Sequence, residues 1–248
     1  MRVAEISRFP VKSMGGEVVE SAHVSELGID GDRRWSVHDV ETGTTLTARR
    51  TPELLFASAR LEGADVVVAL PDGTELGAAD DAALSSWLGR DVELRSADEH
   101  AIDVGGTYEV PLDAEADADW VSWQGPAGAF HDSGRTRVSL VSTDTLGGWD
   151  RRRFRSNLVV DGGGEDELVG RTVSIGGVRL EVTGPVARCV MVVRPQPGLG
   201  RELAVLRSIN AERAGELAVG CLVARPGEIS VGDLVEEDPD DGDRGDGA

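Results

Sequence analysis

The sequence contains little lysine, little cysteine and no long apolar run. Of its 25 lysine and arginine residues only Lys12 is a lysine, and Cys189 and Cys221 are its only cysteines. Two cysteines so far apart do not form the framework of a disulfide-rich protein. No stretch approaches the roughly 18 apolar residues of a membrane helix, and the first residues lack the apolar centre of a signal peptide. We therefore expect a cytoplasmic protein without a membrane partner.

A positive net charge is also absent. The formal net charge is -20 and the pI is about 4.5. Such a surface repels nucleic-acid phosphate and anionic lipid, so neither is an expected partner. The acidic residues are spread along the chain, which resembles the halophilic composition of proteins adapted to molar salt, where a Debye length of about 3 Å screens their repulsion. In so acidic a chain the one retained lysine, Lys12, becomes a candidate functional residue.

What the sequence does contain is a succession of short strand patterns separated by glycine and proline. Alternating apolar residues predict strands at 2–9, 18–27, 33–39, 44–49, 92–95, 135–141 and 157–160, hairpins at 60–76 and 172–182, and closing strands at 220–224 and 228–235. Short helices are predicted at 52–59, 80–88, 142–147 and 202–213. Without βαβ alternation, a doubly wound sheet is excluded. We expect a mainly β fold, β-barrel-like, with mixed strands, a few short helices, and two β-rich domains with a cleft between them.

The strand pattern fades between residues 97 and 134. Within it, residues 113–119 alternate acidic residues with alanine and predict an acidic loop that has little to bury. We place the domain boundary here, with an N-terminal domain at 1–110, a second domain at 111–236 and a disordered acidic tail at 237–248.

Cys189 is the candidate reactive residue. It follows the turn Gly184-Pro185, which ends one strand pattern, and it precedes the apolar run Val190–Val193, which predicts another strand. A cysteine at the mouth of a strand beside Arg188 suits an exposed, rigidly aimed thiolate. Most free cysteines are instead small buried apolar residues, which is how we interpret Cys221. The four histidines show no metal-binding spacing.

Several motifs in a fixed order resemble the MOSC family, which is named after the C-terminal domain of molybdenum cofactor sulfurase. The N-terminal half carries RFPVKSMGG, GIDGDRRW and TLTARRTPEL, and the C-terminal half carries RRRFRSNLVVDG, ARCVMVVRPQPG and PGEISVGD. The resemblance covers nearly the whole chain except the acidic loop and the tail. It implies an N-terminal MOSC β-barrel domain followed by a MOSC domain.

The resemblance also implies a site for the pterin-based molybdenum cofactor (Mo-molybdopterin). It implies a molybdenum-dependent oxidoreductase that reduces N-hydroxylated or N-oxide compounds, similar to the mitochondrial amidoxime-reducing component. Cys189 would be the catalytic residue and the metal ligand. The cofactor-binding residues implied are Lys12, Ser13, Arg33, Ser142, Thr143, Arg155, Asn157 and Arg188. Family-level descriptions add pyridoxal phosphate binding.

The chemistry of these residues agrees with the implied roles. A soft thiolate suits molybdenum, and Lys and Arg suit a phosphate. Ser142 and Thr143 stand at a predicted helix N-terminus, which favours an anion, and Asn157 can both donate to and accept from a pterin. Ser156 and Ala187 depart from the family pattern, which often has proline and a polar residue there.

Alternatives to these roles remain. Cys189 could carry a persulfide in a sulfur or cofactor carrier, or the scaffold could simply bind a small molecule. Either Arg33 or Arg34 could face the cofactor, Ser142 could be a plain helix cap, and residues 151–155 could form a solvated basic face. No four-cysteine ferredoxin pattern follows residue 235, so a reductase would need a separate electron-donor protein besides its small-molecule substrate.

Overall fold

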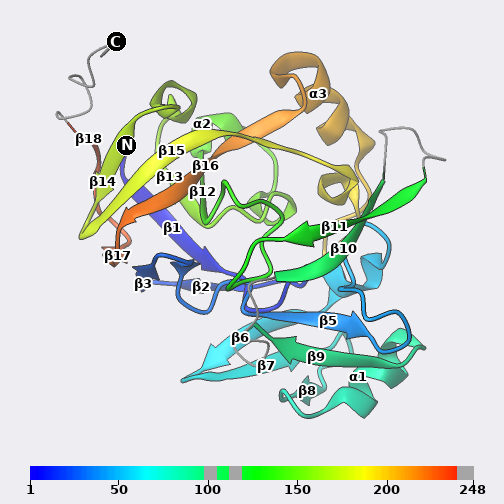
Figure 1. Cartoon of the computed structure of the whole chain (residues 1–248). Helices are drawn as coiled ribbons and strands as arrows, with labels where there is room; N and C mark the ends of the chain where they lie inside the picture. The colour runs from blue at the N-terminus through cyan, green and yellow to red at the C-terminus, as the bar shows by residue number, and fades with distance from the viewer. Residues whose placement is uncertain (98–104, 112–118, 239–248) are drawn as a thin grey trace, which may run out of the picture.

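A sheet of eight strands forms the centre of the computed structural model, which describes residues 1–97, 105–111 and 119–238 (Figure 1). Neighbouring strands are antiparallel except β12 and β13, which are parallel. The first strands of the chain complete a sheet whose other members all come from its second half. In order across the sheet, the strands are β18 (Val235–Glu237), β14 (Thr172–Ile175), β15 (Val178–Ala187), β16 (Glu216–Arg225), β12 (Val138–Ser142), β13 (Leu158–Val160), β1 (Val3–Arg8) and β2 (Glu17–Val19).

Four smaller sheets accompany the large one. They are β17 (Gly227–Ser230), β3 (Ser21–Ser25) and β4 (Gly28–Ile29); β6 (Ser58–Glu62), β7 (Asp65–Ala69) and β8 (Glu75–Leu76); β5 (Trp35–Asp39) with β9 (Val92–Ser96); and β10 (Gly105–Pro111) with β11 (Trp120–Gly125). In Figure 1, β5 to β9 and helix α1 (Asp81–Leu88) form a lower lobe, while the large sheet and helix α3 (Leu203–Arg213) form the upper one.

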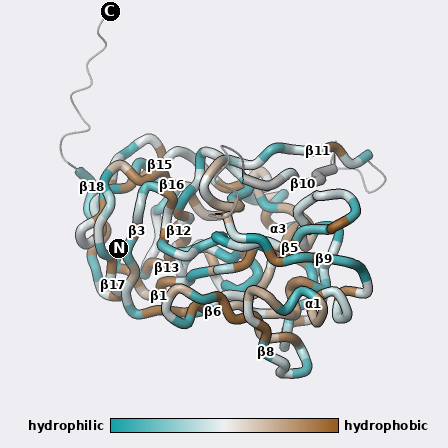
Figure 2. The backbone as a smooth tube through the Cα atoms, turned by 60° about the horizontal axis from the view of Figure 1, so that its bottom comes forward, coloured by the Kyte–Doolittle hydropathy of each residue, from teal (hydrophilic) through white to brown (hydrophobic). Residues whose placement is uncertain are grey.

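Each lobe has its own apolar core. The largest cluster lies in the upper lobe, where residues such as Ile6 of β1 and Leu180 of β15 pack with Ile229 of β17. A second cluster fills the lower lobe around Val37 of β5, and a third lies beneath α3. Figure 2 shows the hydrophobic segments running along these strands. The mainly β fold is therefore as predicted, while the division into domains at residue 110 stays a prediction.

Most predicted elements are present. β1, β5, β9 and β13 occupy the strands predicted from alternation, and the hairpin predicted at 172–182 is β14 and β15. Both longer helices are found, α1 after Asp80 and α3 from Leu203. The helix predicted at 142–147 is α2 (Thr143–Leu146), with Ser142 as its N-cap. The pattern at 228–235 divides into β17 and β18 because a turn separates them.

Several predictions in the N-terminal half are wrong in detail. The strand at 18–27 is two strands, because β2 pairs with β1 whereas β3 pairs with β17. Residues 44–49 form no strand, because beyond the bridge between His38 and Thr45 the chain turns on the Thr47 carbonyl, which accepts from two backbone N–H groups. The predicted helix at 52–59 is a 3-10 helix at Pro52–Phe56.

The segment around Cys189 also differs from its prediction. Gly184-Pro185 does not end the strand, since β15 continues past irregular pairings to Ala187. Val190–Val193 is a 3-10 helix rather than a strand, because Val192 and Val193 are buried in the cluster beneath α3. Packing outweighs the strand propensity of a valine-rich run.

The stretch where the strand pattern fades contains the hairpin of β10 and β11, which the sequence did not predict. The acidic loop at 113–119 lies almost wholly outside the described residues. Glu237 pairs with Val173 in β18, so the tail does not begin at 237, and residues 239–248 are outside the described part. In the residues that the structure describes, no helix has the length and apolar character to cross a membrane.

Candidate functional site

A cavity of about 600 Å³ gathers most of the predicted site residues. Residues from the turns after β1 and β4 line it together with residues from β12, β15 and the segment before β13. We call it the main cavity. The predicted residues that line it are Lys12, Ser13, Arg33, Arg155, Asn157, Arg188 and Cys189.

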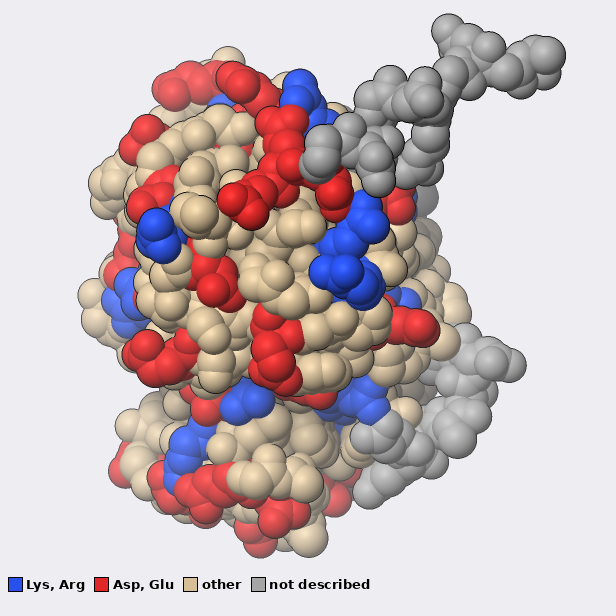
Figure 3. Space-filling view, turned by 90° about the vertical axis from the view of Figure 1, so that its left-hand side faces the viewer, with Lys and Arg blue, Asp and Glu red and all other residues tan. Residues whose placement is uncertain are grey.

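The main cavity is strongly cationic in an acidic protein. Among the described residues, only Asp132 and Glu216 bring carboxylates to its wall. The outer face in Figure 3 shows the opposite balance, with acidic side chains scattered widely over it. Positive charge held in one concave site of a chain with net charge -20 is typical of an anion-binding site. The eight cationic residues are Lys12, Arg33, Arg49, Arg135, Arg137, Arg153, Arg155 and Arg188.

Lys12 is buried in the wall of this cavity, with 4% of its surface exposed. Its Nζ donates to the Phe130 carbonyl at 3.1 Å and to Asp132 Oδ1 at 2.6 Å. Burial lowers the pKa of Lys12, and the Asp132 charge opposes that change.

Asp132 is the acidic counterpart of Lys12 and keeps 66% of its side chain open. Desolvation works against its ionisation, but the charges of Lys12, Arg49 and Arg33 outweigh it and hold the pKa of this carboxyl well below its usual range. Because so much of the side chain is open, we attribute the low pKa to the cations. Asp132 therefore stays anionic and balances part of the positive charge.

Three cavity residues have the left-handed backbone conformation, with a positive φ angle, which residues other than glycine rarely adopt. Their φ angles are 69° at Ser13, 53° at Arg33 and 53° at Arg155. Each such residue costs roughly 1–3 kcal/mol, and such strain is concentrated at functional sites. Ser13 Oγ also accepts from the Ala48 N–H at 3.1 Å, which fixes the turn carrying Arg49.

Arg33, rather than Arg34, faces the main cavity. The Arg33 guanidinium forms an ion pair with Asp32 and donates to the Arg155 carbonyl at 3.3 Å. Arg34 instead donates to the Gly128 carbonyl at 2.6 Å and lies outside the wall. The structure thus decides between two adjacent arginines that the sequence could not distinguish.

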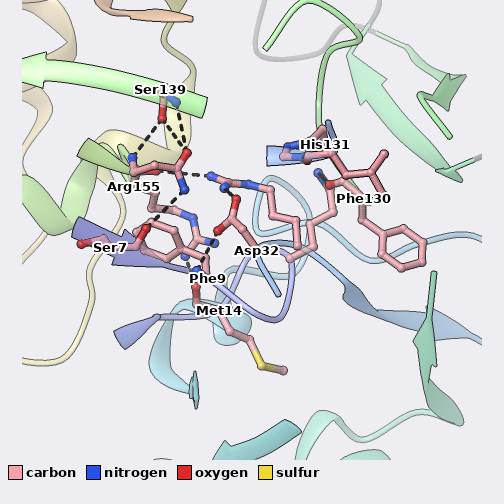
Figure 4. Close-up of polar contacts among 12 residues, drawn as sticks. Ser7, Phe9, Met14, Asp32, Phe130, His131, Ser139 and Arg155 are labelled. Carbon is pink, nitrogen blue, oxygen red and sulfur yellow. Dashed lines mark hydrogen bonds and ion pairs between the residues drawn. The ribbon is translucent and has the colours of Figure 1, made fainter. Parts of the chain in front are cut away.

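Arg155 is a half-buried cation without a carboxylate partner among the described residues. Its guanidinium lies 4.3 Å from the Phe9 ring centroid and donates to the Met14 carbonyl (Figure 4). Burial lowers the pKa of Arg155 to about 9, with the Arg33 charge adding to the effect and Asp32 opposing it. An anion in the cavity would compensate this charge.

Asn157 braces the cavity wall. Its Oδ1 accepts from both the N–H and the Oγ of Ser139 at 3.1 Å, and its Nδ2 donates to the Ser7 carbonyl at 3.3 Å (Figure 4). These bonds link β1, β12 and β13. One amide hydrogen is left for a ligand, so the side chain has a structural role first.

Cys189 lies at the end of β15, partly exposed, and lines the cavity. Arg188 beside it donates to the Leu217 carbonyl at 2.7 Å, the Phe154 carbonyl at 2.8 Å and Ser156 Oγ at 3.4 Å. Burial lowers the pKa of Arg188 to about 10, against the Cys189 charge. Arg188 therefore lines the cavity and also anchors the backbone beside the thiol.

Arg49 is the cation that interacts with Cys189 from the N-terminal half. Burial opposes its charge, but the charge of Cys189, then that of Asp132, and a hydrogen bond with Cys189 raise the pKa of Arg49. The Arg49 carbonyl in turn accepts from Arg194 at 3.2 Å. Arg49 lies within the motif TLTARRTPEL, and nothing in the sequence predicted its contact with Cys189.

Ser142 and Thr143 do not line the main cavity. Ser142 is fully buried and its Oγ accepts from the Thr145 N–H at 3.1 Å, while Thr143 Oγ1 donates to the Gly162 carbonyl. Their hydroxyls are occupied by capping α2 and holding the following loop. Ser142 is thus the N-cap of α2, and the cofactor role of both residues stays a prediction that their position does not support.

Two other residues of the cavity wall, His131 and Arg137, were not predicted from the sequence. His131 is buried and its Nε2 contacts the Leu27 carbonyl at 3.1 Å. Burial, with a contribution from Arg33, lowers its pKa to about 4, so it is neutral at pH 7. Arg137 also lines the wall, and its Nη1 has no partner in the described part of the chain. Within those residues, no group of three or more His, Cys, Asp or Glu could hold a metal ion.

The fold and site define a mainly β protein with a cationic cavity whose wall includes one cysteine. The chain belongs to the MOSC family: residues 1–122 match the MOSC N-terminal beta barrel domain and residues 129–236 match the MOSC domain.

Similar curated proteins include two named molybdenum cofactor sulfurase. The one from Drosophila ananassae is 26% identical over 275 residues, covering 94% of this chain and 34% of that protein. The one from Drosophila erecta is 24% identical over 254 residues, covering 90% of this chain and 32% of that protein. The chain thus spans about a third of the length of these relatives. Among solved structures, the YuaD protein from Bacillus subtilis is 14% identical, covers 95% of this chain and 94% of its own, and has a TM-score of 0.48.

Proposed function

We propose that the main cavity binds the pterin-based molybdenum cofactor and that the protein is an oxidoreductase dependent on it. The observation that carries the proposal is the convergence of eight cationic side chains on one cavity beside a partly exposed cysteine. Membership of the MOSC family and relatives named molybdenum cofactor sulfurase support this class of cofactor.

The residues of the cavity fit such a group. A cavity of about 600 Å³ has the size of a small-molecule site, for which ~300–1,000 Å³ is usual. Lys12, Arg33 and Arg155 would hold the phosphate and pterin, and the half-buried Arg155 has no carboxylate partner in the described part of the chain. Cys189 would be the thiolate ligand. Because the described residues offer no further metal-ligand cluster around it, the remaining ligands would come from the cofactor.

The cofactor would supply two-electron oxygen-transfer chemistry for the reduction of N-hydroxylated or N-oxide small molecules. The chain would supply position and charge. Arg49 would stabilise the anionic form of Cys189, and Arg188 would fix its backbone. The Lys12–Asp132 pair would leave a carboxylate open to the cavity, where it would interact with a cationic group of the substrate. Electrons would come from a separate donor protein.

The test is elemental analysis of the wild-type protein purified from its own host in high salt. We expect about one molybdenum per chain and reduction of benzamidoxime when a chemical reductant is added. Protein that contains no molybdenum and does not acquire the cofactor would overturn the proposal.

A sulfur carrier is the second candidate, favoured by the two arginines at Cys189. Arg49 and Arg188 would stabilise a persulfide anion on this residue as they would a thiolate. The relatives named molybdenum cofactor sulfurase point in the same direction. Sulfur released by cyanide from protein without molybdenum would support the carrier, whereas stoichiometric molybdenum without such sulfur would support the reductase.

A further inference from the structure

A second cavity of about 320 Å³ lies against Arg155, which lines it as well as the main cavity. Cys189 does not line this second cavity. Its walls are largely apolar, formed by Phe9, Val18 and Phe56 together with the backbone of Gly15 and Gly16. Val18 is 57% exposed and Phe56 is 37% exposed, so the mouth of the cavity presents apolar surface to solvent. The proposed function uses none of this apolar wall.

Most charged side chains of the second cavity already have a partner. Glu5 is paired with Arg151, and Glu17 with Arg8 at 2.9 Å. The remaining rim arginine, Arg152, binds Asp150 at 2.7 Å. These pairs compensate one another and leave no net charge for a ligand to neutralise.

Two hydrogen-bond donors of the wall, on Arg155 and Gln196, have no such charged partner among the described residues. The Arg155 guanidinium donates to the Met14 carbonyl and stacks on Phe9 but meets no carboxylate among the described residues. Gln196 also lines the cavity, and its buried Nε2 has no partner within the same set of residues. A buried donor without an acceptor is unfavourable. A ligand that brings a hydrogen-bond acceptor and a negative charge would therefore satisfy both donors of this wall.

We propose that the second cavity binds a small aromatic carboxylate. Its carboxylate would accept from Arg155 and Gln196, because a planar guanidinium matches a planar carboxylate. Its ring would pack between Phe9, Val18 and Phe56, where aromatic rings prefer offset or edge contacts. A phosphate would fit less well, because it carries more charge and the wall supplies one uncompensated cation. The site goes beyond the proposed function, since it takes a different ligand and binding there needs neither molybdenum nor Cys189. Because the two cavities share Arg155, its charge is uncompensated only in cofactor-free protein, and the titration uses protein in that state.

The test is a fluorine NMR titration of the full chain with 4-fluorobenzoate and, separately, with the neutral 4-fluorobenzamide. We expect saturable binding of the acid and at least ~10-fold weaker binding of the amide, since only the acid pairs with Arg155. Backbone amide shifts should move at Gly15 and Gly16, which line the second cavity, and not at Gly184 and Val186, which line the main cavity.

A matched pair of variants locates the site independently. Val18→Asp places a carboxylate at the mouth of the second cavity, and Val40→Asp adds the same charge at a valine that is 54% exposed and lines neither cavity. Both positions are on the surface, so both variants should fold. We expect affinity for 4-fluorobenzoate to fall at least ~10-fold in Val18→Asp and to stay unchanged in Val40→Asp. Equal binding of acid and amide, unchanged binding in Val18→Asp, or shifts confined to the main cavity would each overturn the proposal.

Discussion

Two arginines of the main cavity, Arg155 and Arg188, differ from arginines of the outer surface in how their charge is compensated. Arg60, on the surface, binds Glu62 at 2.6 Å and Glu75 at 2.9 Å, and Arg213 binds Asp166 at 2.5 Å. In the cavity, Arg155 and Arg188 are half-buried and bond to backbone carbonyls without any ion pair to the described residues. Although the chain has abundant carboxylates, none of those described pairs with these two cations. That difference supports the proposal that the cavity binds an external anion.

The two cysteines offer the strongest test of this comparison. Cys189 faces the cavity, whereas Cys221 is fully buried in the largest apolar cluster, where burial raises its pKa to about 12. We expect Cys189→Ser to lose molybdenum and at least ~100-fold of the reductase activity, consistent with loss of an essential ligand. Cys221→Ser should keep both, though with reduced stability. Metal analysis and benzamidoxime turnover measure the outcome, and equal effects of the two substitutions would contradict the assignment.

A buried and an exposed histidine, His131 and His23, allow the same comparison for the pH dependence of the free energy of unfolding. His131 is buried at the cavity, and its pKa in the folded protein is about 4, below the ordinary value of 6.5. Its contribution to stability is fully present above pH 6.5 and is lost as the pH falls toward 4, because the unfolded chain binds the proton first. We expect the free energy of unfolding to fall by up to ~3 kcal/mol across this window.

The measurement is urea unfolding between pH 7 and pH 4 for wild type and two variants. His131→Gln should flatten the pH dependence, and His23→Gln should leave it nearly unchanged because the His23 side chain is 46% exposed. A wild-type slope that survives in His131→Gln would show that another group titrates in this range.

Replacement of the buried lysine tests whether the cavity charge binds anions. Lys12→Met removes the partner of Asp132 and one cation of the cavity. Since a hydrogen bond to a charged group contributes ~1.5–3 kcal/mol, we expect affinity for pyrophosphate to fall ~10- to 100-fold in cofactor-free protein. Arg60→Met removes a cation whose charge is already compensated by two glutamates, so it should leave the affinity unchanged. Calorimetric titration separates these outcomes.

Salt should screen the charges of the outer surface more than the charges of the main cavity. Raising potassium chloride from 0.1 M to 1 M shortens the Debye length from about 10 Å to about 3 Å and screens the exposed acidic residues. We expect an increase of a few degrees in the melting temperature. The relative loss of affinity in Lys12→Met should persist in high salt, because the Lys12–Asp132 pair is partly buried. A melting temperature that falls with salt would contradict the halophilic interpretation.

Part of the site could be predicted from residues that are unusual for this chain. Lys12 stood out as the only lysine, and Cys189 stood out beside Arg188 after a strand. Asp132 gave no such signal, because it is an ordinary acidic residue whose partner Lys12 lies 120 positions away in the chain. Ser142 gave a misleading signal, since the same residue that begins an anion-binding helix also makes a plain cap.

The same division applies to the fold. Alternating patterns predicted β1, β5 and the β14–β15 hairpin, because one face of each strand must be buried. The run Val190–Val193 was misassigned as a strand, since its 3-10 conformation depends on packing beneath α3. β2 and β3 pair with different sheets, which no local pattern reveals.

The amino-acid sequence by itself determined the acidity of the molecule and its mainly β character, and it singled out Cys189 as the candidate reactive cysteine, because composition and short-range periodicity depend only on neighbouring residues. The tertiary structure alone decided which arginines face the cavity, which ones are compensated by carboxylates, and that Arg49 meets Cys189. Those outcomes depend on the close approach of segments such as 47–50 and 188–194, which are far apart in the chain. Electrostatic interactions act over such short distances in space regardless of separation in sequence.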